Sequence, residues 1–204
     1  MKDLVVLTAD AAMSATMTQL LTKRQKSLGI RPIEFTVATH LKHDPGCRVD
    51  AAGRLRGHRH NHRFALVMFD KRGCGKETDP REAIQNEVEL KLEGNGWTDR
   101  SKAIVIDPEL EAWVWNDSPH TARILGWKQG YAKLRAWLHG AGLWPADDLK
   151  PPDPKEAFRR ALRTQGLPRS SKMFVKLAGS VGLSKCQDPA FMELKSTLSE
   201  WFPK

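Results

Sequence analysis

Three apolar runs of this sequence, at residues 4–10, 64–70 and 103–107, end on Asp10, Asp70 and Asp107. Short continuous apolar runs are typical of strands that are buried on both faces of a parallel sheet. The carboxyl ends of parallel strands lie along one edge, where such proteins bind their ligands. We therefore expect carboxylates from distant parts of the chain to meet there. Their oxygens could hold Mg²⁺, which can orient a water and stabilise charge on a phosphoryl group.

Each of these aspartates also has a structural explanation. Asp10 could cap the helix that follows it, and Asp70 precedes a glycine-containing turn, in which aspartate is common. Asp107 is followed by proline, a pair that helix capping explains without any chemistry. Glu111 follows one turn later among apolar residues, and a carboxylate that is buried there needs a partner or a metal. Asp70 and Glu111 are therefore favoured over Asp107 as site residues.

Aspartate followed by proline recurs along the chain and predicts where helices begin. Asp79 and Asp153 each precede a proline and have a glutamate three residues further on, which is the pattern of an N-capping aspartate. Asp188 precedes a proline in the same way. We predict that helices start at all three positions.

The elements that would position the carboxylates follow from the spacing of apolar residues. Residues 13–28 have apolar side chains on one helical face, and residues 33–37 resemble a second strand, so the chain starts with a βαβ unit. Residues 40–63 are rich in glycine, proline, histidine and arginine, and we interpret them as an exposed, irregular basic insertion.

The predicted fold class is α/β, with a mostly parallel sheet flanked by helices. The sheet and its helices occupy residues 1–118, and a helical C-terminal extension at residues 119–204 packs on this core. Tryptophans are frequent in the extension, and large aromatic side chains usually contribute to packing. We expect this role for Trp127, Trp137, Trp144 and Trp201. Stacking on nucleotide bases is the alternative.

The net charge of +9 favours a polyanionic partner, because each phosphate that a Lys or Arg neutralises releases counterions. The densest basic run, at residues 54–63, contributes Arg54, Arg56, Arg59 and Arg63 together with three histidines. We interpret it as a loop that contacts the phosphates of a nucleic acid. A plain solvated loop and a zinc site formed by the histidines are the alternatives, although the ligand spacing of a zinc finger is missing.

Several other classes of protein find little support in the sequence. The chain has neither a P-loop nor the Gly-x-Ser-x-Gly motif of many hydrolases. Its three cysteines are widely spaced, which indicates reduced thiols. It lacks an apolar run of membrane-spanning length and a signal sequence, so we expect a cytoplasmic protein with no membrane partner.

Three features together resemble the small Toprim-like proteins of bacterial anti-phage defence clusters. They are the strand–helix start, the strand that ends at Asp70 before a glycine turn, and the segment Ile-Asp-Pro-Glu-Leu-Glu-Ala-Trp-Val-Trp-Asn-Asp at residues 106–117. Within these clusters, a component of the methylation-associated defence system is the most similar. The resemblance extends through Pro-Arg-Ser-Ser at residues 168–171 to the Trp-Phe-Pro ending. It implies a Toprim-like sheet, action on nucleic acid, and other defence proteins as partners.

Toprim domains of topoisomerases, primases and nucleases hold Mg²⁺ with a glutamate after the first strand and an Asp-x-Asp pair after a later one. The matching positions here are Asp10, Asp70 and Arg72, and an arginine cannot replace an oxygen ligand. Related Toprim-like families carry an acidic residue in a Glu-Ala-Trp-like segment, which is Glu111 in this chain. The resemblance thus implies either an altered metal site or a fold that has lost catalysis.

Two main hypotheses result. In the first, the protein is a Mg²⁺-dependent nuclease: Asp10, Asp70 and Glu111 hold a metal that activates water against a phosphodiester, while Arg72 and the 54–63 loop hold the backbone. In the second, it is a non-catalytic module of a defence system that binds nucleic acid or a partner protein. A third hypothesis, an enzyme that acts on a phosphorylated small molecule, uses the same loop.

Overall fold

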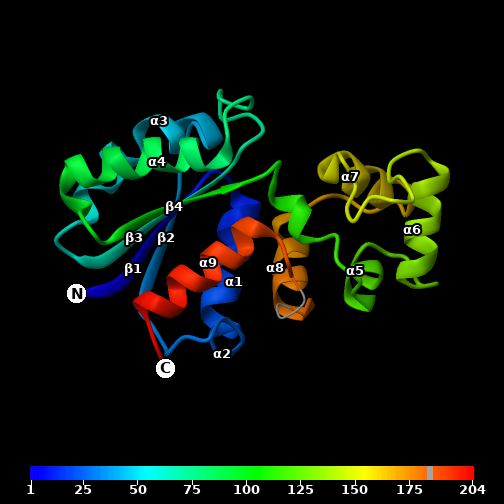
Figure 1. Cartoon of the computed structure of the whole chain (residues 1–204). Helices are drawn as coiled ribbons and strands as arrows, with labels where there is room; N and C mark the ends of the chain where they lie inside the picture. The colour runs from blue at the N-terminus through cyan, green and yellow to red at the C-terminus, as the bar shows by residue number, and fades with distance from the viewer. Residues whose placement is uncertain (183–185) are drawn as a thin grey trace.

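The computed structural model describes residues 1–182 and 186–204. Four strands form one parallel sheet in the order β2-β1-β3-β4, which confirms the predicted α/β class (Figure 1). Each strand is close to the position that the apolar runs predict, with β2 two residues later than expected. The strands are β1 (Lys2–Thr8), β2 (Phe35–Thr39), β3 (His62–Asp70) and β4 (Ser101–Ile106).

Helices cover both faces of the sheet (Figure 1). Helix α1 (Ala11–Lys23) and the short α2 (Gln25–Leu28) lead from β1 to β2 along one face, while α3 (His43–Leu55) and α4 (Arg81–Leu92) cover the other. The chain first moves outward to β2 and then crosses β1 to reach β3. In open α/β sheets the ligand crevice lies at the carboxyl ends of the strands where the order reverses, so β1 and β3 flank the expected site.

Residues 43–55 correct the prediction of an irregular insertion at 40–63, because they form helix α3 and pack on the sheet. Cys47, Ala51 and Leu55, spaced four residues apart, are fully or almost fully buried. Two of these three residues are small and the stripe lies among charged residues, which concealed it in the sequence. Pro45 lies in the first turn of the helix, where proline costs no hydrogen bond.

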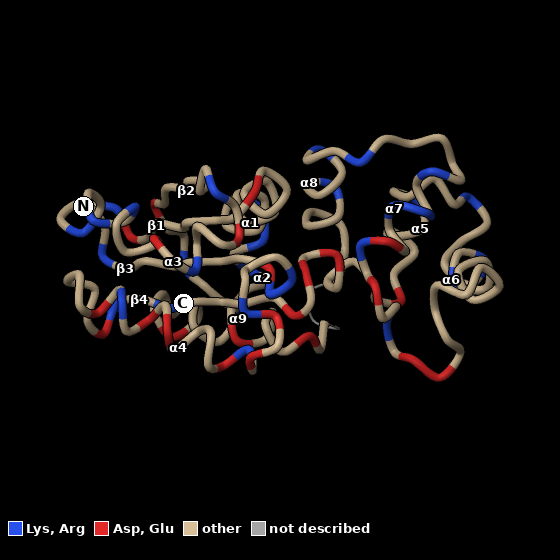
Figure 2. The backbone as a smooth tube through the Cα atoms, turned by 90° about the horizontal axis from the view of Figure 1, so that it is seen from above, with Lys and Arg blue, Asp and Glu red and all other residues tan. Residues whose placement is uncertain are grey.

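The C-terminal half is helical, as expected, and part of it returns to the sheet. Helix α8 (Ser171–Ser180) packs against α1, and α9 (Pro189–Trp201) packs against β4. Helices α5, α6 and α7 form a lobe beyond the carboxyl edge of the sheet (Figures 1 and 2). The elements are the 3₁₀ helix η3 (Leu110–Trp113), α5 (Pro119–Ile124), α6 (Tyr131–Gly140), α7 (Pro154–Thr164), α8 (Ser171–Ser180) and α9 (Pro189–Trp201).

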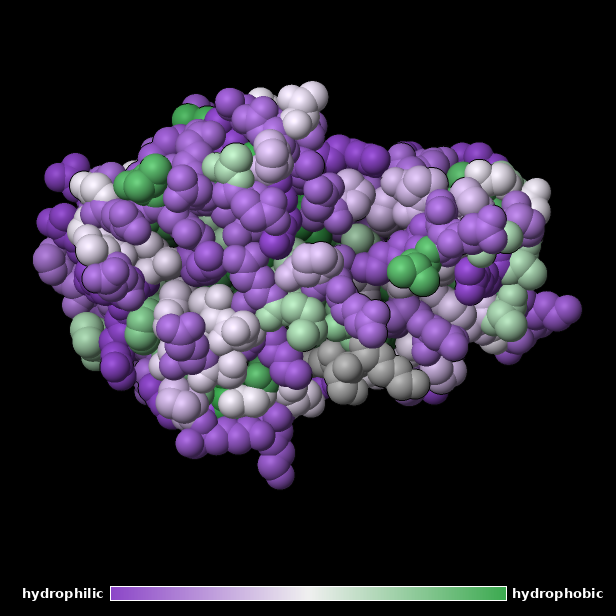
Figure 3. All heavy atoms as spheres, in the orientation of Figure 1, coloured by the Kyte–Doolittle hydropathy of each residue, from purple (hydrophilic) through white to green (hydrophobic). Residues whose placement is uncertain are grey.

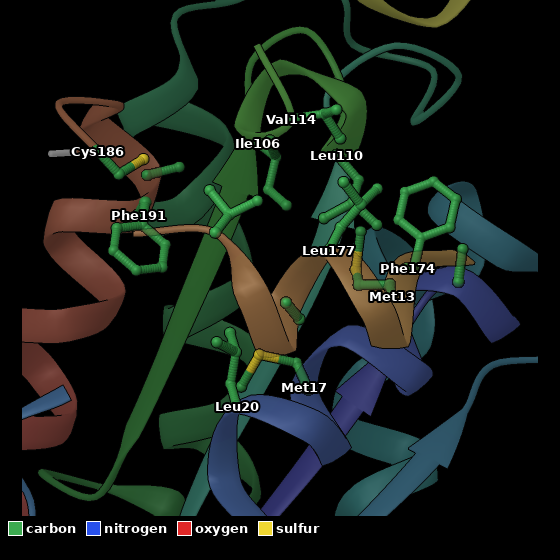
Figure 4. Close-up of a cluster of buried hydrophobic side chains, with 14 of the residues drawn as sticks. Met13, Met17, Leu20, Ile106, Leu110, Val114, Phe174, Leu177, Cys186 and Phe191 are labelled. Atoms are coloured by element: carbon green, nitrogen blue, oxygen red, sulfur yellow. The ribbon is translucent and has the colours of Figure 1, made fainter. Parts of the chain in front are cut away.

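One hydrophobic cluster joins the α1 face of the sheet to the C-terminal helices. Met13 of α1, Leu110 of η3, Phe174 of α8 and Phe191 of α9 all belong to it (Figure 4). The predicted packing role of the four C-terminal tryptophans is confirmed. Trp127 and Trp144 are buried within the cluster, and the other two pack against it.

The molecular surface is mostly hydrophilic on the face shown in Figure 3, where hydrophobic residues are scattered in small groups. None of the helices in residues 1–182 and 186–204 combines the length and the apolar character that a membrane span requires.

Candidate functional site

Asp70 is the last residue of β3 and is only 7 % exposed. Its carboxylate Oδ1 accepts a hydrogen bond from the backbone N–H of Leu110 at 2.9 Å. Its own N–H donates to Oδ1 of Asp44 at 2.8 Å. Asp70 therefore connects the end of β3 to η3 on one side and to the start of α3 on the other.

Asp44 is a further member of the site, and it was not predicted from the sequence. It precedes Pro45 and belongs to the same series of Asp-Pro pairs that predicted the helix starts, so this signal could have identified it. Burial raises the pKa of the Asp44 carboxyl, and the nearby charge of Asp10 raises it further. We call the group of Asp10, Asp44, Asp70 and Glu111 the acidic edge.

The members of the acidic edge influence one another through their charges. Burial raises the pKa of Asp70 well above its ordinary value, and the charges of Asp44, Glu111 and Asp10 add to this effect. The positive charge of Lys155 lowers the pKa of Asp70, but it offsets the increase only in part. The charges of Asp10 and Glu111, the other two carboxylates that the sequence singled out, therefore both act on Asp70.

Asp10 performs the structural role that was considered for it. Its Oδ1 accepts a hydrogen bond from the backbone N–H of Met13 at 2.8 Å and so caps helix α1. Capping satisfies one of the N–H groups that the first turn of a helix leaves without a partner.

Glu111 is fully buried, as its apolar neighbours indicated, and its partner is an arginine. Its Oε1 accepts hydrogen bonds from Nε and Nη2 of Arg169 at 3.1 and 3.0 Å. The other oxygen, Oε2, is buried without a hydrogen-bond donor in the described structure. Arg169 lies 58 residues later in the chain, between α7 and α8, so this ion pair joins the sheet edge to the C-terminal helices.

Arg72 is also committed to a structural network. It pairs with Asp153 at 2.9 Å and with Glu109 at 3.3 Å. Glu109 is 1 % exposed and accepts the backbone N–H of Lys155 at 2.9 Å. Burial raises the pKa of the Glu109 carboxyl. The charge of Arg72, which was predicted to hold a nucleic-acid backbone, is therefore used to fasten η3 to the start of α7.

Two of the predicted helix caps are wrong. Asp107 is half exposed and pairs with Lys71 at 2.9 Å, and the capping position of η3 belongs to Glu109. Asp79 pairs with Lys76 at 3.0 Å, and Pro80, not Asp79, stands at the start of α4. The caps of α7 and α9 are confirmed, because the side chains of Asp153 and Asp188 accept N–H groups of the first turns of those helices.

The acidic edge, as arranged, does not fit the predicted Mg²⁺ site. The orphaned Oε2 of Glu111 is an atom that a cation could satisfy. However, among the described residues no three His, Cys, Asp or Glu side chains are placed so that they could share one metal ion. Asp10 is turned to its helix, Glu111 to Arg169, and Asp70 to the N–H of Leu110.

The arginines of the basic run lie at the opposite edge of the sheet. Helix α3 starts beside Asp70 and runs back to the amino edge, where β3 begins at His62. At about 3.3 Å per residue, the nine residues of β3 separate the two edges by roughly 30 Å. The two groups therefore do not share one compact site, and the role of the basic run in holding a nucleic-acid backbone stays a prediction.

We call Arg54, Arg56, Arg59 and Arg63 the amino-edge cluster. Arg54, Arg56 and Arg63 are exposed and Arg59 is half-buried. None of the four forms an ion pair with any residue that the structure describes. The zinc alternative gains no support, since the described residues hold no group of three metal ligands and His62 is buried with its Nε2 beside the Thr36 hydroxyl at 3.0 Å.

No protein-family model matches this chain, and no curated protein or solved structure matches it at a significant level. The resemblance to Toprim-like defence proteins therefore stays a prediction. The function has to be inferred from the charges and contacts of the chain itself.

Proposed function

We propose that this protein is a nucleic-acid-binding component of a bacterial anti-phage defence system, active in the cytoplasm beside other defence proteins, and that it works by binding rather than cleavage. One observation carries the proposal: the amino-edge cluster presents four arginines within ten residues, and none of them is neutralised by a described acidic side chain. Unpaired cations bind nucleic acid favourably because phosphates that they neutralise release counterions. The resemblance to Toprim-like defence proteins supports the biological setting.

The state of the acidic edge supports binding over cleavage. Each carboxylate that a nuclease would need already has a structural partner, namely the first turn of α1 for Asp10, the N–H of Leu110 for Asp70 and Arg169 for Glu111. The two cations that follow Asp70 in sequence are paired as well, Lys71 with Asp107 and Arg72 with Glu109 and Asp153.

A binding assay tests this proposal. Fluorescence anisotropy with labelled DNA and RNA is measured for the wild type and for Arg56→Glu/Arg63→Glu. The matched control is Lys23→Glu/Lys26→Glu, which makes the same charge change at two exposed lysines of α1 and α2. We expect the amino-edge variant to bind at least about tenfold more weakly than the control, since several phosphate contacts are lost. A wild-type protein that binds no nucleic acid at low salt contradicts the proposal.

A Mg²⁺-dependent nuclease is the second candidate, and one observation favours it. The acidic edge lies at the carboxyl ends of β1 and β3, where the strand order reverses, and burial together with the charges of Asp44 and Glu111 raises the pKa of Asp70. Perturbed carboxyl groups at such a position are typical of functional sites.

Incubation of plasmid DNA and of single-stranded DNA and RNA with the protein separates the two candidates. Mg²⁺, Mn²⁺ and EDTA are compared, and Asp70→Asn serves as the inactive variant. Metal-dependent cleavage that is lost in Asp70→Asn would replace the binding proposal. Intact substrates under conditions where the protein binds them support it.

A further inference from the structure

A second basic surface lies on the C-terminal helices. Residues 157–182 contain six Lys and Arg residues and neither Asp nor Glu, which accounts for six of the nine net positive charges of the chain. Figure 2 shows blue and no red along α8 and the segment that leads into it. The six cations, which we call the α7–α8 surface, are Arg159, Arg160, Arg163, Arg169, Lys172 and Lys176.

The α7–α8 surface is hollowed on both sides of the segment between the two helices. One hollow, of about 400 Å³, is lined by Arg159, Arg163 and Arg169. The other, of about 460 Å³, lies between α5 and α8 and is lined by Arg123, Lys172 and Lys176. The hydroxyl-bearing residues Ser170 and Ser180 also line this second hollow, and no carboxylate lines either of them.

Most of these cations have no acidic partner. Arg160, Arg163, Lys172 and Lys176 form no ion pair with any residue in the described parts of the chain. Arg159 pairs only with Glu156, at 3.4 Å on the surface, and such exposed pairs are weak. Arg169 is the exception, because it is bound to Glu111.

The spacing of these cations lowers the stability of the helices that carry them when no ligand is bound. Arg159 and Arg163 are four residues apart on α7, and Lys172 and Lys176 are four residues apart on α8. Such pairs face the same way, and like charges at this spacing destabilise a helix. An anion bound between the members of each pair removes this repulsion, so the arrangement suits a ligand with several negative charges.

The exposure of the aromatic and apolar side chains on α7 and α8 indicates which kind of polyanion this surface suits. Phe158 and Phe174 are at most 2 % exposed, so α7 and α8 present no aromatic ring on which an unpaired base could stack. Leu177 is 5 % exposed, and Leu167 and Val175 are the large hydrophobic side chains exposed on this part of the described chain, at 36 % each. Two such side chains are far fewer than the apolar face that a membrane-bound helix inserts into lipid. A polyanion that offers only its phosphates, with its bases paired inside, matches these properties best.

We infer that the α7–α8 surface binds the phosphate backbone of a double-stranded nucleic acid, with phosphates in the two hollows beside Arg163 and beside Lys172 and Lys176. This inference rests on the proposal that the protein binds nucleic acid, and it adds a second contact surface and the duplex form of the ligand. Binding through the backbone alone is independent of sequence and falls steeply as salt rises.

The test compares Lys172→Glu/Lys176→Glu with the control Lys23→Glu/Lys26→Glu. Anisotropy is measured with a labelled DNA duplex and with one of its strands alone, and co-sedimentation is measured with phosphatidylserine vesicles. Melting temperatures establish that both variants are folded. We expect the α8 variant to bind the duplex at least about tenfold more weakly than the control, and the wild type to prefer the duplex over the single strand.

Other outcomes overturn the inference in distinguishable ways. If only Arg56→Glu/Arg63→Glu loses affinity, the proposed function stands and the α7–α8 surface is not part of it. If the single strand binds as tightly as the duplex, the assignment of a duplex is wrong. Vesicle binding that exceeds duplex binding assigns the surface to a membrane. A wild type that binds no nucleic acid overturns the inference together with the proposed function.

Discussion

The acidic edge and the α7–α8 surface are neighbours that use their charges in opposite ways. At the acidic edge, the cations within reach are bound to carboxylates: Arg72 to Glu109 and Asp153, and Arg169 to Glu111. On the α7–α8 surface, Arg163, Lys172 and Lys176 have no such partner among the described residues. Paired charges hold the sheet to the C-terminal helices, whereas unpaired ones can exchange their counterions for phosphates.

Arg169 lies at the boundary between the two regions. It belongs to the structural cations, whereas its neighbours on the α7–α8 surface are the proposed ligand-binding cations. Its guanidinium contacts Glu111 and also stacks over the ring of Phe174, 5.0 Å from the ring centroid. Substitution of Arg169 should therefore change stability, whereas substitution of its neighbours should change binding.

The largest expected effect is that of Arg169→Ala. It leaves the Glu111 carboxylate buried at 0 % exposure without its partner, and removal of one partner from a buried ion pair costs about 3–5 kcal/mol. We expect the free energy of unfolding in urea to fall by about 3 kcal/mol. The matched control is Arg163→Ala, and an equal loss in both variants would show that the ion pair is not structural.

Arg72→Ala should have the next largest effect. It removes the cation that joins Glu109 to Asp153, although Glu109 keeps the N–H of Lys155 as a donor. We therefore expect a loss of about 1–2 kcal/mol in urea unfolding. Asp153→Asn is the companion variant, because the amide retains the capping oxygen for α7. An Arg72→Ala protein as stable as the wild type would contradict the proposed fastening of η3 to α7.

Asp70→Asn should stabilise the protein and change its pH dependence. The native pKa of Asp70 is raised, so the native state binds this proton more tightly than the unfolded state does. The wild type therefore loses stability as pH rises through the interval between the unfolded and native values. The amide keeps an oxygen for the Leu110 N–H and removes the charge.

The variant should be the more stable protein at pH 7, because burial and the neighbouring carboxylates disfavour the charged form of Asp70. This difference should disappear in acid, where the carboxyl is protonated in both states. Urea unfolding at several pH values measures it. A variant that is less stable than the wild type at pH 7 would show that the Asp70 charge is compensated in the folded protein.

The smallest expected effect on stability is that of Lys172→Ala/Lys176→Ala. Both lysines are exposed and neither has an acidic partner in the described structure. Substitutions of this kind usually change the free energy of unfolding by less than about 0.5 kcal/mol each. A larger loss of unfolding free energy would show that these lysines stabilise the fold, as the paired cations at the acidic edge do.

The sequence predicted the sheet well because its strands are buried on both faces. Such strands are continuous apolar runs, and β3 and β4 stand out for this reason. Helix α3 was missed because it is anchored by Cys47, Ala51 and Leu55, a thin stripe in an otherwise charged segment. Asp44 lies in the first turn of α3 and therefore escaped prediction together with the helix.

The site was predicted only in part, for a physical reason. Local rules identify the strand ends, and so Asp10 and Asp70, and apolar neighbours indicate that Glu111 is buried. What those carboxylates contact depends on segments that are distant in sequence. The partner of Glu111 lies 58 residues away, and the partners of Arg72 are Glu109 before η3 and Asp153 at the cap of α7. The opposite placement of the amino-edge cluster likewise follows from the direction of α3 and not from its composition.

The most direct measurement is the salt dependence of duplex binding for the wild type and for Lys172→Ala/Lys176→Ala. The central claim is that unpaired cations of this protein neutralise phosphates, and each such contact to B-DNA contributes about 0.9 to the slope of log K against log salt. We predict a steep slope for the wild type and one that is shallower by about 1.8 for the double variant. Duplex binding that does not change with salt, or an equal slope in both proteins, would contradict the account.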